Sequence, residues 1–336
     1  MHESSHWRDV AAERAWLRTW QAEGALGTVL PADALCDPPS RQWRRFLDRL
    51  ALWLGVALCA AGAICYVAAN WAHLGKFERL AGAQALLVLA TVAAARLGPT
   101  RVAGQATLWL ATMLLGALLA LIGQTYQTGA DTWELFATWT VLALPWTFAA
   151  RNAAQWLTWA ALLNIAAGLW LALAQDSQWF GARNHTTWLG ALNVLLLALW
   201  EIAGRRWPEF AGHAGRWLLA AAAVSMLSMA AMDDLFFENF ETDSAGKFGL
   251  FGLPSAVWCA ATLAIGAFYL RVRRDPAVLA MLALGIVAVT TALLTRILLT
   301  GDEGDPMRHL AIALSVVVQA ACAAVVLRRL ARGEAA

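Results

Sequence analysis

Charged residues are scarce in this sequence. Asp, Glu, Lys and Arg make up 14% of the 336 residues, whereas a soluble domain carries about 25%. The net charge is only +2 and no long basic run is present, so the chain is not expected to bind nucleic acid. Because 60% of the residues are hydrophobic, a disordered chain is excluded as well. The five cysteines show no disulfide framework, since four of them lie inside apolar runs.

Sequence signatures of catalysis and metal binding are also missing. There is no Cys-x-x-Cys, no His-Glu-x-x-His, no Gly-x-Ser-x-Gly and no P-loop. We therefore expect no catalytic residue, no metal site and no cofactor, and we expect that the protein is not an enzyme. Ionisable side chains are absent from the centres of the long apolar segments, where they would be functional by default. Their absence argues against a proton-relay pump.

Long apolar segments, by contrast, recur along most of the chain. A helix needs about 20 residues to cross the roughly 30 Å hydrocarbon layer. On that measure the sequence predicts an all-α, polytopic membrane bundle of about ten transmembrane helices over residues 46–330, preceded by a segment at 1–45. The spans are predicted to start near Leu50, Leu80, Ala106, Trp133, Ala153, Thr187, Trp217, Leu250, Ala277 and Leu310.

The distribution of basic residues predicts the orientation of these spans. With ten crossings, 19 of the 25 Lys and Arg residues fall on the side of the N-terminus and six on the other side. Basic loops stay preferentially in the cytoplasm, so both termini are predicted to be cytoplasmic. The excess of Arg over Lys and the high Ala content are typical of a high-GC bacterium. We therefore expect a multi-pass protein in contact with the lipid bilayer of a bacterial cytoplasmic (inner) membrane.

The segment before the first span is predicted to contain a cytoplasmic helix. Ser5 can cap a helix that runs to about Glu23, and Trp7 and Trp20 contribute to a partial apolar stripe along it. The stripe leaves two alternatives open. Residues 5–23 either dock on the bundle or the membrane surface, or bind a cytoplasmic or membrane protein partner.

Polar side chains cluster at the predicted outer ends of the first, third and fourth spans. Amides, a phenol and two carboxylates in a turn without basic residues can bind a cation or a polar ligand. In the alternative interpretation, Asp131 and Glu134 form a D-x-x-E capping pattern that only starts the fourth span. The candidate ligand-binding residues are Asn70, Trp71, Gln124, Tyr126, Asp131 and Glu134.

Three amides, Asn164, Asn193 and Gln319, lie near the predicted membrane midplane. Side chains of this kind either hydrogen-bond neighbouring helices or line a substrate path. Small residues at Gly116 and Gly123 on the third span predict close helix packing.

A family resemblance rests on the stretches AANW (68–71) and IGQTYQTGADTWELFATW (122–139), which follow the Trp-bearing N-terminal helix. Over about residues 7–154 the chain resembles the bacterial predicted membrane proteins grouped as domain of unknown function 2157. The resemblance implies an inner-membrane protein and directs attention to the outer cluster. It implies no chemistry.

Three functions are compatible with these features. The first is a non-enzymatic scaffold or sensor-type membrane protein, which the missing buried charge and catalytic motifs favour. The alternative is a small-molecule permease with a 5+5 span arrangement, a site at the three midplane amides and a helix break at Pro145. An outer-face enzyme using Asp131 or Glu134 as acid or base is the least favoured.

Overall fold

The computed structural model describes residues 39–69, 75–127, 129–174, 180, 184–237, 252–299 and 306–331. Within these ranges the protein consists of ten α-helices and one short 3-10 helix, without a β-strand. The predicted helix at residues 5–23, Asn70 and Trp71 lie outside the described residues. The elements are α3 (Pro39–Ala69), α4 (Lys76–Leu97), α5 (Val102–Tyr126), α6 (Thr132–Ala150), α7 (Ala153–Leu173), α8 (His185–Ala203), η1 (Pro208–Phe210), α9 (His213–Phe237), α10 (Leu253–Arg271), α11 (Pro276–Leu299) and α12 (Pro306–Ala331).

The all-α prediction is confirmed, and each of the ten predicted spans corresponds to one helix. α4 to α12 begin within about four residues of the predicted starts, whereas α3 begins at Pro39, well before Leu50. Eight of the helices, α4, α5 and α7 to α12, are long and apolar enough to cross a membrane. α6, whose 19 residues include three Trp, four Thr and Glu134, is not among them. The count of ten crossings therefore stays a prediction.

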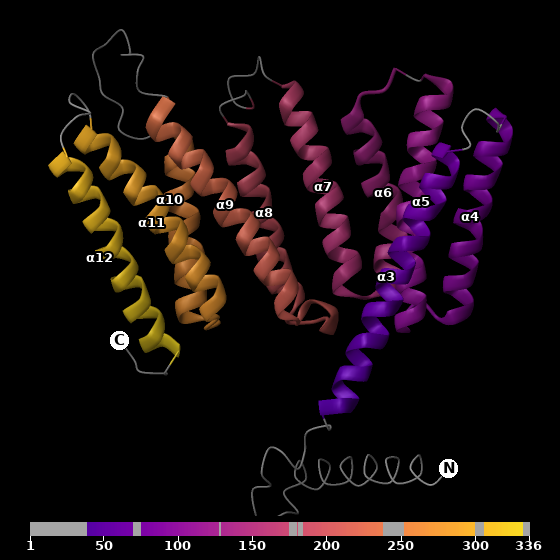
Figure 1. Ribbon diagram of the computed structural model, residues 1–336, viewed down its shortest axis with the longest axis horizontal. Helices are drawn as coiled ribbons and strands as arrows, with labels where there is room; N and C mark the ends of the chain where they lie inside the picture. The colour runs from indigo at the N-terminus through magenta and orange to yellow at the C-terminus, as the bar shows by residue number, and fades with distance from the viewer. Residues whose placement is uncertain are drawn as a thin grey trace, which may run out of the picture. The chain divides into compact units, whose positions relative to one another are not determined.

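The chain forms two compact units, Met1–Ala69 with α3 and Asn70–Ala336 with the other helices. In the second unit consecutive helices pack as antiparallel hairpins, α4 with α5, α6 with α7, and α8 with α9 (Figure 1). α11 packs against both α9 and α12. Gly98 makes the turn between α4 and α5 with a φ of +89°, which side chains other than glycine rarely adopt.

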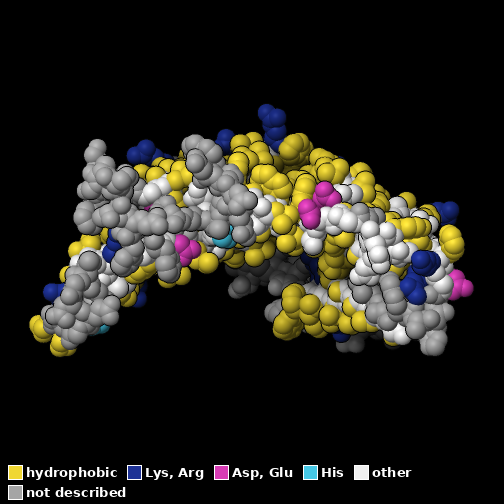
Figure 2. All heavy atoms as spheres, turned by 90° about the horizontal axis from the view of Figure 1, so that it is seen from above, with side chains coloured by type: hydrophobic (Ala, Val, Ile, Leu, Met, Phe, Trp, Pro, Cys, Tyr) yellow, Lys and Arg dark blue, Asp and Glu magenta, His cyan; other side chains and the backbone are white. Residues whose placement is uncertain are grey.

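Apolar side chains are distributed as expected for helices surrounded by lipid. The largest buried cluster is formed by α7 to α11 and includes Trp200, Phe210 and Leu279. Many other large apolar residues are exposed, such as Leu263 and Leu284, and hydrophobic side chains cover much of the face seen in Figure 2. Lipid offers hydroxyl groups no partner, and several threonines inside the helices donate to carbonyls one turn back, as Thr112 does to Leu108 at 3.0 Å.

Close packing at Gly116, predicted from the small-residue pattern, is seen between α5 and α6. A Cβ atom at this position would lie 2.2 Å from the ring of Trp139, whose indole N–H donates to the carbonyl of Thr112 at 2.8 Å. Gly123, two turns further along the same face of the helix, has nothing within 4 Å of such an atom, so the close packing predicted there is not seen. The two glycines therefore have different roles.

Gly116→Ala should lower the thermal unfolding midpoint of the detergent-purified protein, because the hydrogen-bonded Trp139 ring has to move. Overpacking of this kind costs about 1–3 kcal/mol. Gly123→Ala is the matched control, and it should be neutral or slightly stabilising since Ala favours a helix over Gly by up to about 1 kcal/mol. Equal midpoints for the two variants would contradict the close approach of α5 and α6.

Candidate functional site

The outer cluster predicted from the sequence corresponds in part to a cavity between α5 and α6. Its volume is about 410 Å³, and Gln124, Asp131 and Glu134 line it together with Gln127 and apolar residues. Tyr126 ends α5 and is 60% exposed, but it is not part of the lining. The structure thus brings three of the six predicted ligand-binding residues to one cavity.

The turn between the two helices positions these side chains. α5 ends at Gln127 in the left-handed conformation (φ 45°), and Gly129 also has a positive φ of 67°. Asp131 occupies the N-cap position of α6, where its backbone carbonyl accepts from Glu134 N at 3.0 Å. Its side chain makes no capping hydrogen bond. The capping interpretation is therefore confirmed for the position of Asp131 but not for its carboxylate.

The polar groups of this cavity are not engaged elsewhere. No hydrogen bond or ion pair connects the side chains of Gln124, Gln127, Asp131 or Glu134 with another residue that the structure describes. The lining contains no Lys or Arg. Among the described residues, no group of three or more His, Cys, Asp and Glu side chains is placed to hold a metal ion. The donor set of two carboxylates and two amides suits a small polar or cationic ligand.

The predicted midplane amides lie in two helix pairs. Asn193 of α8, 2% exposed, donates to the side chain of Asn164 on α7 at 2.6 Å and to the carbonyl of Leu189 at 2.9 Å. Gln319 of α12 instead accepts from Thr290 of α11 at 2.5 Å. α6 continues as a helix through Pro145, so the break predicted there is wrong. Each amide connects its helix with a neighbour.

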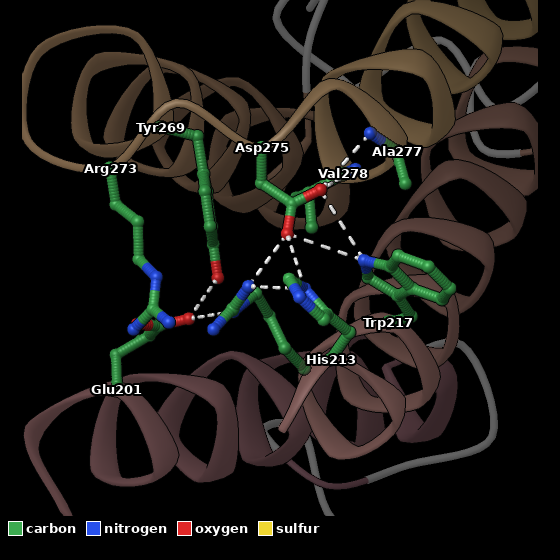
Figure 3. Close-up of polar contacts among 9 residues, drawn as sticks. Glu201, His213, Trp217, Tyr269, Arg273, Asp275, Ala277 and Val278 are labelled. Carbon is green, nitrogen blue, oxygen red and sulfur yellow. Dashed lines mark hydrogen bonds and ion pairs between the residues drawn. The ribbon is translucent and has the colours of Figure 1, made fainter. Parts of the chain in front are cut away.

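A network of buried charges, which the sequence did not predict, connects α8 to α11 at the opposite end of the helices (Figure 3). Arg216, in the first turn of α9, is 1% exposed. Its Nε atom lies 2.6 Å from Glu201 Oε1 in the last turn of α8, and its Nη1 atom lies 2.7 Å from Asp275 Oδ2. Glu201 also accepts from the Tyr269 hydroxyl at 2.8 Å and from Arg273 at 2.9 Å.

Asp275 connects this network with the start of α11. Its Oδ1 atom accepts from the backbone amides of Ala277 and Val278 at 3.1 and 3.4 Å, and the Trp217 indole donates to the same carboxylate at 3.3 Å. Burial alone raises the pKa of the Asp275 carboxyl. The hydrogen bonds from Arg216, Trp217 and the two amides outweigh this effect, so the pKa lies below its ordinary value.

Two carboxylates and two guanidinium groups balance each other in the network. His213 adds a ring nitrogen 3.3 Å from Arg216 Nη1. Breaking a buried ion pair by removing one partner costs about 3–5 kcal/mol, because the other charge is left uncompensated. The network therefore fixes the ends of α8, α9, α10 and α11 relative to one another, and its charges are paired, although Arg216 Nη2 has no hydrogen-bond partner among the described residues.

One signal for this network was available in the sequence. Asp275 directly precedes Pro276, and Asp before Pro is typical of a helix start, with Asp at the N-cap. The pairing of Asp275 with Arg216, 59 positions earlier, depends on how α9 and α11 pack, which a single sequence does not reveal.

Residues 18–156 match the family described as Predicted membrane protein (DUF2157). The match confirms the resemblance inferred from the sequence over these residues. It covers the cavity between α5 and α6 and ends in the first turn of α7, so the buried charge network lies outside it. No curated protein and no solved structure matches the chain. Together with the eight apolar helices, the family match identifies an integral multi-pass membrane protein.

Asp275→Asn should reduce stability in a pH-dependent way. Since the pKa of Asp275 is lowered by folding, its charged form stabilises the fold above the ordinary pKa of about 3.9, and this contribution is lost as pH falls through the lower folded value. The thermal midpoint of the variant should therefore lie below that of the wild type at pH 7, by the equivalent of up to about 3–5 kcal/mol. The difference should shrink at about pH 3.

The matched control is Asp233→Asn, which changes an exposed carboxylate on α9. It should follow the wild type at both pH values. A deficit of Asp275→Asn that stays constant from pH 7 to about pH 3 would show that the carboxylate charge does not stabilise the network.

Proposed function

We propose that this protein is a non-enzymatic, sensor-type or scaffold protein of the bacterial cytoplasmic membrane, and that its outer cavity binds a small polar ligand. One observation carries the proposal. The midplane amides and the buried charges between the helices have partners on neighbouring helices, whereas the polar side chains of the cavity between α5 and α6 have no partner among the described residues.

The pairing of the interior groups favours a structural role for them. A polar group without a partner inside a bilayer costs several kcal/mol, so amides and charges between helices stabilise packing when they are mutually satisfied. Using Asn164 and Asn193 for substrate would require their hydrogen bonds to break in every transport cycle. The continuous helix at Pro145 removes a second feature expected of a permease. The permease alternative is therefore less well supported.

The outer cavity has the opposite properties. Asp131 and Glu134 are exposed at the end of α6, where water reaches them, and the cavity wall behind them is largely apolar. Two carboxylates without a basic neighbour in the lining favour a ligand with an ammonium group or several hydrogen-bond donors. Their exposure favours binding over catalysis.

In the proposed topology the chain crosses the membrane ten times with both termini in the cytoplasm. α6 is a decisive crossing because it is, like α3, not among the eight helices that length and composition mark as spans. Its 19 residues extend about 28 Å, close to the hydrocarbon thickness. In this topology α6 begins with Thr132 at the outer cavity, and Arg151, directly after its last residue, lies on the cytoplasmic side with most of the basic residues. Residues 5–23 would meet a cytoplasmic partner in this arrangement.

A thermal-shift panel of small amines, amino acids, sugars and divalent cations tests the binding proposal. A ligand that binds only the folded state stabilises it by about 2.7 kcal/mol at a hundred times its Kd. At least one compound should raise the midpoint of the wild type, and this shift should disappear in Glu134→Gln. Glu78→Gln, which alters the exposed carboxylate at the start of α4, should keep it.

Other outcomes of the panel contradict the proposal. A shift that is kept in Glu134→Gln but lost in Asn164→Ala favours the permease. A panel without any shift rejects ligand binding at the cavity by these chemical classes.

The topology is tested with single cysteines in a variant whose five natural cysteines are replaced by Ala. Ala130→Cys precedes α6 and Ala211→Cys follows η1, both at exposed positions. A membrane-impermeant maleimide applied to spheroplasts should label the first at once and the second only after permeabilisation. If α6 does not cross, only α7 and α8 separate the two sites and both become labelled on the same side.

A further inference from the structure

A second cavity lies at the opposite end of the helices from the outer cavity, between α7 and α8. Its volume is about 610 Å³, and it is lined by the end of α6 and by α7, α8, η1 and α9. Large apolar side chains on its margin are exposed, among them Phe148 at 63%, Leu199 at 52% and Ile202 at 59%. α7 and α8 are both long and apolar enough to span the membrane. The cavity is therefore a groove that opens toward lipid.

Aromatic rings build the wall of the groove. Trp156 contacts Phe148 edge to face with ring centroids 5.0 Å apart, and it also contacts Phe210 at 5.3 Å. Phe210 contacts Trp200 at 4.8 Å. Rings that pack on one another in this way hold their places, so the groove is preformed.

The groove extends from the helix ends into the hydrocarbon region. From Arg151 at its mouth to Ala160 on α7, the lining covers about two turns of helix, or roughly 10–13 Å. Trp207, which also lines the groove, is 48% exposed, as is typical of a side chain at the headgroup level. The dimensions fit the upper part of an acyl chain.

The mouth carries one charge of each sign. Arg151 Nε lies 3.8 Å from Glu209 Oε1, which is too long for a hydrogen bond. The Arg151 side chain is 58% exposed and the Glu209 side chain 9% exposed. The guanidinium is therefore open to an anion, while the carboxylate beside it repels a ligand that is only anionic.

We propose that this groove binds a phospholipid with a phosphoethanolamine headgroup. The acyl chain occupies the aromatic groove, the phosphate contacts Arg151, and the primary ammonium group contacts Glu209. A phosphatidylglycerol would satisfy Arg151 but offer Glu209 only the neutral hydroxyl groups of its glycerol in place of the ammonium group. The quaternary ammonium group of a phosphatidylcholine has no N–H, so it cannot donate a hydrogen bond to Glu209.

The test is native mass spectrometry of the full-length protein with lipids of identical acyl chains and different headgroups. The wild type should retain phosphatidylethanolamine about tenfold more strongly than phosphatidylglycerol or phosphatidylcholine, the difference that one charge-assisted hydrogen bond gives. Glu209→Gln should abolish this preference while binding of phosphatidylglycerol stays equal or rises. Arg206→Gln, an exposed position outside the groove lining, should behave as wild type.

A second pair of variants tests the acyl-chain site independently of the headgroup. Ala203→Trp fills the groove and should reduce retention of all three lipids, whereas Leu284→Trp on an exposed face of α11 should not. Equal retention of the three lipids by the wild type, or an unchanged preference in Glu209→Gln, would overturn the proposal. If Ala203→Trp does not fold, the comparison between wild type and Glu209→Gln still decides.

Discussion

Much of the described structure depends on the ion pairs that the guanidinium group of Arg216 makes with Glu201 and Asp275. Arg216 is almost completely buried at the end of an apolar helix, a position that is costly for a charge unless opposite charges surround it. Glu201 and Asp275 provide those charges from α8 and from the start of α11. Because Glu201 also accepts hydrogen bonds from Tyr269 and Arg273, the end of α10 is held beside the ends of these helices. A single buried cation thus determines how four helix ends meet.

The consequences extend to the groove between α7 and α8. Trp200 lies one residue before Glu201, and its ring packs against Gly215, one residue before Arg216, where a Cβ atom would lie 2.0 Å from it. The same ring contacts Phe210 of η1, which forms part of the groove wall. The charge network and the aromatic wall are therefore built on the same residues of α8 and α9. Disturbing one is expected to distort the other.

The sequence predicted the helices much better than their contacts. Long apolar segments mark where helices occur, so every one of the ten predicted spans corresponds to a helix. Most of these helices are apolar on all sides, however, and the pattern does not reveal which face meets a neighbour. The cavity residues Gln124, Asp131 and Glu134 could be predicted because they are close in sequence on either side of one turn. The partners of Arg216 could not, since they come from helix ends that only folding brings together.

The arrangement of α6 constrains how a sensor of this kind could signal. Its first turn carries Glu134 in the outer cavity, and its last residue precedes Arg151 at the mouth of the lipid groove. A ligand that draws the first turn of α6 toward α5 would move a helix that two hydrogen bonds hold. Trp139 of α6 donates to the carbonyl of Thr112 on α5, and Trp159 of α7 donates to the carbonyl of Thr140 on α6. Pro145 lies beyond both contacts and lacks the backbone N–H that would stiffen the helix there. A shift at the outer end can therefore reach Arg151 as a movement of the whole helix that strains these two hydrogen bonds, or as a bend at Pro145. In both cases the hydrogen bonds of the two tryptophans resist the movement, as does the bond from Gln105 to the carbonyl of Ala150 at the far end of α6, and these contacts add to the energetic cost of coupling the cavity to the groove.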